Sequence, residues 1–176
     1  LGGHAIRDVA RLDCKRLLPY LGLLSLRAHS AALIETVLRY YFKHDRLFIE
    51  QWVARSVSIV PQQRNQLGLA NHGLGLDLVL GERVADCVGK FRVHIVGLDW
   101  QRFHEFLPFG TGYQPLCALV RLTVRDPLNY DLRLVLAEGE IRALHIGERN
   151  VCRLGWTSWL AHERADGVVT LAGNVQ

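Results

Sequence analysis

The chain has 176 residues, of which 49% are hydrophobic and 22% are charged, and its formal net charge is +4. This composition is typical of a folded globular domain and excludes a disordered chain. It also argues against a membrane-spanning helix, which needs roughly 20 apolar residues, because the longest apolar run is interrupted by Pro19 and Gly22. The chain begins at Leu1, contains no methionine and shows no signal peptide, so we expect a processed chain or part of a longer one.

A helical segment is predicted for residues 1–45. Residues 1–27 have helical character, and Pro19 is expected to kink this run or to mark its first turn. Ser30 precedes AALIETVLRYYF, in which apolar residues recur at helical spacing. This pattern predicts a second helix with Ser30 as its N-cap.

A β-rich part is predicted for residues 46–176. The stretch RLFIEQWVARSVSIV, which ends at Pro61, is rich in β-branched and aromatic residues and predicts one or two strands. KFRVHIVGL alternates, with Lys90, Arg92 and His94 on one face and apolar residues on the other, as in a half-buried strand.

Two further helices are expected in DWQRFHEFLP, capped by Asp99, and in YQPLCALVRLTVRD, which ends before Pro127. Strands return in YDLRLVL, followed by a turn near Gly139, and in VVTLA at the end of the chain. The predicted fold is therefore α+β: an N-terminal helical pair, then a mixed, mainly antiparallel β part with a two-helix insertion, in one continuous unit.

The pair Gly89 and Lys90 suggests a phosphate-binding loop, G-x-x-x-x-G-K-[ST], and hence a nucleotide-binding enzyme. The first glycine of that pattern is replaced by Val84, and the metal-binding hydroxyl is replaced by Phe91. The residues that follow alternate like a strand, whereas a phosphate loop leads into a helix. Nucleotide chemistry is therefore not predicted here, and GLGLDL, with Leu78 in place of a third glycine, does not match a dinucleotide loop.

The reactive side chains form no pattern that predicts a catalytic, metal or cofactor site. The eight histidines match no zinc template, and no nucleophile elbow or thiol-protease signature is present. The four cysteines are widely separated, which favours reduced thiols; they are Cys14, Cys87, Cys117 and Cys152. We therefore expect no enzyme.

A basic interaction module, one that binds nucleic acid for example, is the alternative that the pI of about 9.1 leaves open. The 21 lysines and arginines are dispersed among acids and form no dense run, so nucleic acid is not the predicted partner. Trp156 and Trp159, near Arg153, fit either core packing or a protein interface, where tryptophan and arginine are enriched. Lys90 and Arg92 are further candidates for such an interface.

Four stretches, taken together and in order, resemble one family. They are LGERVADCVGKFR at 80–92, FLP at 106–108, DLRLVL at 131–136 and RLGWTSWL at 153–160. The set resembles the C-terminal half of the TssG family (ImpH or VasB), baseplate wedge subunits of the bacterial type VI secretion system, from about residue 13 to 170. The family commonly has an aromatic residue where this chain has Ala85, and its N-terminal half is not matched.

This resemblance implies a structural protein without a cofactor. It implies a hetero-oligomeric complex with TssF, TssK and TssE that templates the contractile tail. The expected location is the cytoplasm, at the baseplate docked on the inner membrane, with no direct membrane insertion.

Overall fold

The computed structural model describes residues 12, 14–25, 30–124, 126–142, 153–159 and 166–174. The chain folds into two compact units, residues 1–51 with 91–176 and residues 52–90. We call the first the sheet unit and the second the ribbon unit. The predicted helical segment 1–45 thus shares a unit with the main sheet, and the sequence did not indicate the boundaries around 52–90.

The described part of the sheet unit begins with short helical pieces. These are α2 (Cys14–Leu17), the 3-10 turn η1 (Leu18–Tyr20) and α3 (Leu21–Leu24). Pro19 lies in η1, where the chain leaves α-helical geometry because proline has no N–H to donate within a helix. The predicted interruption at Pro19 is confirmed.

Helix α4 (Ala31–Phe42) begins at the predicted cap. The Ser30 hydroxyl accepts the N–H of Leu33 at 3.2 Å, which satisfies one of the free donors of the first turn. The helix ends at Lys43, whose φ of 50° is left-handed, a conformation that stops helices but costs a non-glycine residue roughly 1 kcal/mol. Its buried face consists of Ile34, Val37, Leu38 and Tyr41.

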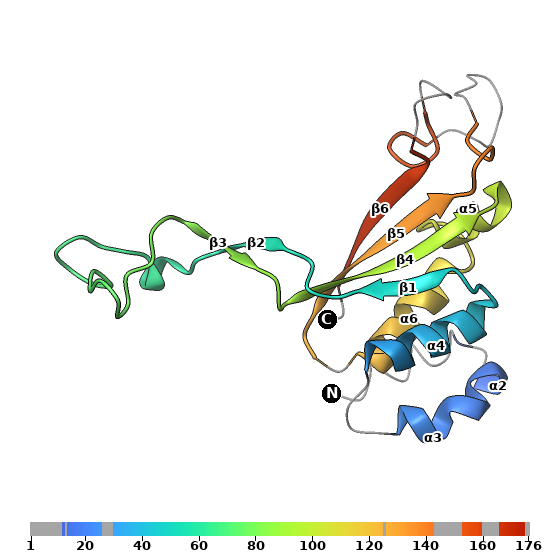
Figure 1. Cartoon of the computed structure of the whole chain (residues 1–176), viewed down its shortest axis with the longest axis horizontal. Helices are drawn as coiled ribbons and strands as arrows, with labels where there is room; N and C mark the ends of the chain where they lie inside the picture. Colours follow the sequence, from blue (N-terminus) through green and yellow to red (C-terminus); the bar gives the residue numbers. More distant parts are fainter. Residues whose placement is uncertain are drawn as a thin grey trace. The chain divides into compact units, whose positions relative to one another are not determined.

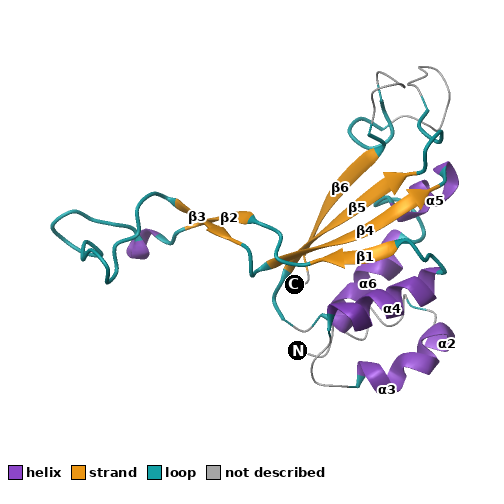
Figure 2. Ribbon diagram, viewed as in Figure 1, coloured by secondary structure: helices purple, strands orange, loops and turns teal. Residues whose placement is uncertain are grey.

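The main sheet has the strand order β1-β4-β5-β6 and is shown in Figures 1 and 2. Its strands are β1 (Leu47–Glu50), β4 (Lys90–Leu98), β5 (Asn129–Leu136) and β6 (Val168–Asn174). The outer pairs, β1 with β4 and β5 with β6, are antiparallel. The central strands β4 and β5 point the same way in Figure 1, so they require a crossover connection.

Helices α5 (Trp100–Phe106) and α6 (Tyr113–Thr123) form this crossover. As predicted, Asp99 caps α5, and its carboxylate accepts the N–H of Arg102 at 2.6 Å. Pro115 lies in the first turn of α6, where the missing N–H breaks no helical bond. The predicted α+β fold, with a mainly antiparallel sheet and a two-helix insertion, is confirmed.

The hydrophobic core lies between the sheet and the helices. Alternate residues of β4, Phe91, Val93 and Ile95, join it together with buried residues of α4, α6 and β5. Figure 2 shows α4 and α6 on the same side of the sheet. The alternation predicted for β4 therefore fixes which side chains, among them Arg92, lie opposite the core.

The ribbon unit contains two short antiparallel strands, β2 (Arg55–Ser58) and β3 (Arg83–Asp86). Between them lie the 3-10 turn η2 (Pro61–Gln63) and a long loop. Asn71, with a left-handed φ of 52°, organises the loop, because its amide donates to the carbonyls of Gln62 and Arg64. The structure describes all of residues 52–90, and the only hydrophobic residues buried among them are Val53 and Ile59.

Candidate interaction surfaces

The stretch around Gly89 and Lys90 is a turn that a carboxylate organises. One oxygen of Asp86 accepts the N–H groups of Val88 at 2.9 Å and Gly89 at 3.3 Å, and the other accepts Nε of Arg55 at 2.7 Å. These hydrogen bonds, led by that from Arg55, lower the pKa of Asp86. The backbone donors that a phosphate would require are therefore already occupied.

Gly89 leaves room for the Arg55 guanidinium, which lies against it. A Cβ atom there would lie 2.0 Å from Nη2 of Arg55 and 2.7 Å from Oδ2 of Asp86. Lys90 then opens β4, which confirms the predicted strand. The glycine thus serves the fold of the ribbon unit.

Carboxylates of the chain itself neutralise the polar face of β4. Across the β1–β4 pair, Glu50 lies opposite Arg92, and their side chains form an ion pair at 3.2 Å. Arg92 also reaches Asp131 on β5 at 3.3 Å. His94 lies 2.8 Å from Glu50 and stacks on Phe48 with ring centroids 4.5 Å apart.

These contacts set the ionisation of Glu50. The hydrogen bond with His94, assisted by the charge of Arg92, lowers the pKa of this carboxyl against the opposing effect of burial. Arg92, a predicted interface residue, is therefore engaged within the sheet unit, whereas Lys90 belongs to the ribbon unit by the division of the chain. Both residues lie on β4, two positions apart, and a role for either in an interface stays a prediction.

Several arginines are paired in the same way, which weakens the nucleic-acid alternative. Arg39 pairs with Glu35, Arg55 with Asp86, and Arg64 with Glu82. A surface that binds phosphates needs cations free to replace counterions. Pairing with carboxylates removes part of that capacity from this modestly basic chain.

Arg153 and Trp156 lie in a tight turn that is packed on Phe109. The Arg153 guanidinium lies 3.8 Å from the Phe109 ring centroid, and the rings of Phe109 and Trp156 stack at 6.0 Å. The Thr157 hydroxyl accepts the N–H of Arg153 at 2.8 Å and holds the turn closed. Leu154, at the turn, is 96% exposed.

Trp159 packs on a different part of the same aromatic row. Its ring centroid lies 6.1 Å from those of Trp100 and Phe103 on α5. Trp100 contacts His104, which contacts Phe109, so the row extends from Trp159 to the turn at Trp156. The two tryptophans therefore have packing partners of their own, and a role for them in an interface stays a prediction.

Five strongly exposed leucines belong to the ribbon unit. Leu67, Leu69, Leu74, Leu76 and Leu80 are each between 78% and 92% exposed. Leucine is usually buried, and large apolar side chains that stay exposed are candidates for interaction sites. Sequence reasoning tested this segment as a dinucleotide-binding loop and missed the leucines. The available signal was that these leucines recur among glycines. A glycine-rich segment of this kind predicts no helix or strand that could bury them.

The described residues offer little for catalysis. They contain no group of three or more His, Cys, Asp or Glu side chains arranged to hold a metal ion. His44 and His104 bind backbone carbonyls of Val96 and Trp100. Cys87 and Cys117 are free thiols, whereas the Cys14 side chain and Cys152 lie outside the described residues. Among the described residues no helix is long and apolar enough to cross a membrane.

Comparisons with known proteins find one matching family model and two solved structures of similar fold. A family model described as "Type VI secretion, TssG" matches residues 1–161. Among solved structures, a chain of a type VI secretion TssK-TssF-TssG baseplate subcomplex is similar, with a TM-score of 0.69 and 18% identity over 97% of this chain and 71% of that chain. A chain of a type VI secretion baseplate complex has a TM-score of 0.56 and 20% identity, over 90% of this chain and 46% of that chain. No curated protein matches.

Proposed function

We propose that this chain, which belongs to the TssG family of type VI secretion proteins, serves the secretion baseplate as a structural subunit and not as an enzyme. The family match supports a structural component of the baseplate. The two similar structures, both chains of baseplate complexes, have the same fold at low identity. The absence of a catalytic pattern in the sequence is consistent with this role.

The proposed partners are TssF and TssK, which are named with TssG in the subcomplex that contains the similar chain. TssE is a third proposed partner, on the family resemblance alone. The proposed location is the cytoplasmic face of the inner membrane, where the baseplate would be docked. In that setting the chain would template the contractile tail by holding other subunits in place.

The exposed leucines of the ribbon unit are the observation that carries this proposal. An isolated protein gains nothing by leaving five leucines in water, since burial of each stabilises by roughly 1.5–3 kcal/mol. Binding would bury them and also order the ribbon loop, which offsets part of that gain. The ribbon unit is therefore proposed as a docking surface for another baseplate subunit.

The turn of Arg153 and Trp156 is proposed as a second, smaller contact. Arg153 presents a cation, and Leu154 an exposed apolar side chain, on a turn that the aromatic row supports. Such rigid aromatic and arginine surfaces are typical of interface hot spots. Trp159, Lys90 and Arg92, which are half-buried as Trp156 also is, remain further proposed contacts.

Co-expression of the whole protein with TssF and TssK tests the function. We expect a stable complex for the wild type, and at least a tenfold loss of retained partner for the double variant Leu74→Ser and Leu76→Ser. Leu18→Ser, an exposed leucine of the sheet unit, serves as the control and should retain the complex. A wild-type chain that purifies alone would refute the assignment.

A further inference from the structure

The main sheet has two edges, and they differ in how their backbone groups are shielded. Strands β1 and β6 are the outermost strands of the described sheet (Figure 2). An edge strand presents a row of N–H and C=O groups that can pair with another chain, so natural proteins shorten, charge or cover such strands. The two edges therefore show on which side this sheet can accept a further strand.

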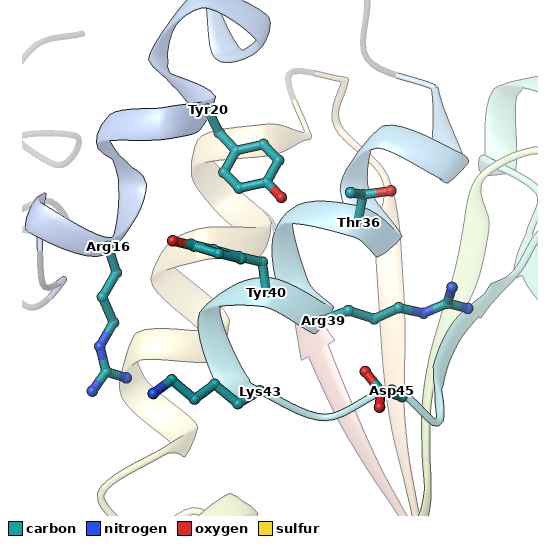
Figure 3. Close-up of a pocket in the computed structure, with 7 residues that line it drawn as sticks. All are labelled: Arg16, Tyr20, Thr36, Arg39, Tyr40, Lys43 and Asp45. Carbon is teal, nitrogen blue, oxygen red and sulfur yellow. The ribbon is translucent and has the colours of Figure 1, made fainter.

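Side chains of α4 shield the β1 edge. In an antiparallel pair every second residue directs its backbone groups away from the neighbouring strand, and in β1 these residues are Leu47 and Ile49. Arg39 donates from Nε to the Leu47 carbonyl, and Glu35 accepts the N–H of Ile49 at 2.8 Å. Figure 3, a close-up of a pocket beside α4, shows the Arg39 side chain extending from the helix towards the sheet. The β1 edge, only four residues long, is therefore covered by its own chain.

The β6 edge has no such shield among the described residues. The N–H of Leu136 on β5 bonds the Gly167 carbonyl, so the register of the two strands directs the backbone groups of Val168, Thr170 and Ala172 away from β5. These outward N–H and C=O groups make no hydrogen bond with any described residue. Thr170 and Ala172 are also exposed. The outward row of β6 is therefore available to an external strand.

The sequence of β6 also lacks the features that keep other chains away from a sheet edge. VVTLAGN is seven residues long and contains neither a charged residue nor a proline. Valine and threonine favour the extended backbone that strand pairing requires. Because the strand is uncharged, its edge selects a partner by backbone geometry and not by charge.

The spacing of the outward groups specifies what can occupy this edge. Outward residues of a strand recur at roughly 7 Å, and an extended peptide presents complementary groups at the same spacing, which is how peptides add to exposed sheet edges. Val169 and Leu171 are buried in the core, whereas Thr170 between them is exposed. An added strand would continue both faces, with apolar side chains beside Val169 and Leu171 and a polar one beside Thr170.

We propose that the β6 edge receives an extended segment of a neighbouring baseplate subunit, which adds a fifth strand to this four-stranded sheet. The inference rests on the proposed function, which supplies neighbouring subunits. It differs from docking on the ribbon unit, where exposed leucine side chains carry the contact. At β6 the backbone hydrogen bonds provide affinity, and the alternating side chains of the segment provide specificity.

Hydrogen exchange resolved to single amides tests this inference in the whole protein, alone and in complex with purified TssF and TssK. We expect the amides of Val168, Thr170 and Ala172 to exchange at least tenfold more slowly in the complex, because each gains a hydrogen bond. The amides of Val169 and Leu171, which face β5, are the internal control and should be protected in both states. Unchanged rates at the three outward amides within a stable complex would overturn the inference alone. Failure of the wild type to form any complex would overturn the proposed function with it.

A proline on the edge gives a second test. Thr170→Pro removes one outward N–H and leaves the hydrogen bonds to β5, and edge strands tolerate proline where the N–H faces outward. We expect it to weaken binding of the partners at least tenfold, whereas Thr170→Val keeps the N–H and the shape and should bind like the wild type. Equal binding by the two variants would refute the added strand. So would protection of the outward amides in the protein alone that rises with its concentration, since the occupant would then be a second copy of this chain.

Discussion

The sheet unit and the ribbon unit use the same apolar residue types in opposite ways. In the sheet unit Leu38, Leu47 and Leu134 are fully buried, whereas Leu74 and Leu76 of the ribbon unit are about as exposed as a side chain can be. Hydrophobic burial stabilises the first unit. The second keeps its shape through hydrogen bonds and ion pairs such as Arg55–Asp86. Leucine content alone therefore does not show where a core lies. A core forms only where a second surface can pack against the leucines.

Removal of a core aromatic should give the largest effect on stability. Phe103 is fully buried on α5, so Phe103→Ala should lower the free energy of unfolding by about 3–5 kcal/mol through lost burial and a cavity. Leu74→Ala is the matched change in the ribbon unit and should stay within about 0.5 kcal/mol of the wild type. Chemical denaturation of both variants measures the contrast, and comparable losses would show that the ribbon leucines are packed in solution.

Removal of the Asp86 carboxylate should loosen the ribbon unit alone. Asp86→Ala deletes the partner of Arg55 and of two backbone N–H groups, so amides of β2 and β3 should exchange with solvent roughly tenfold faster. Amides of β4 and β5 should keep their rates. Glu82→Ala, which removes only the exposed ion pair with Arg64, is the control. Accelerated exchange throughout the sheet would contradict independent stability of the two units.

The smallest expected effect on stability comes from Glu50, which pairs with the polar face of β4. Because the pKa of Glu50 is lowered in the fold, its ionised form stabilises the protein above the ordinary carboxyl pKa, and this contribution disappears as pH falls through the lowered value. The stability difference between wild type and Glu50→Gln should therefore be below about 1 kcal/mol near neutrality, since Glu50 is half-exposed, and should vanish in acid. A stability difference between the two proteins that grows on acidification would contradict the lowered pKa of Glu50.

Local signals in the sequence predicted the elements well. Ser30 and Asp99 cap the helices that they were expected to cap, and the alternation of KFRVHIVGL gave β4 its correct faces. These features depend on residues close in sequence, whose spacing is visible without a fold.

Contacts between residues that are far apart in the sequence were not predicted. The ion pairs of Arg92 depend on the register that places Glu50 opposite it and on the proximity of Asp131 across β4 and β5. The shielding of the β1 edge similarly requires Arg39 and Glu35 of α4 to lie beside that strand. Neither arrangement follows from local spacing, because both arise when separate elements pack together.

The point at which the ribbon unit leaves the sheet has a consequence for evolution. The segment joins β1 to β4, which are hydrogen-bonded neighbours, so the chain departs and returns at adjacent positions of one sheet. The entropy of closing such a connection rises only by about 0.6 kcal/mol for each doubling of its length. Insertions, deletions and wholesale replacement of 52–90 would thus leave the strand register intact. A lineage can therefore change the proposed docking surface while it inherits the sheet unit unchanged.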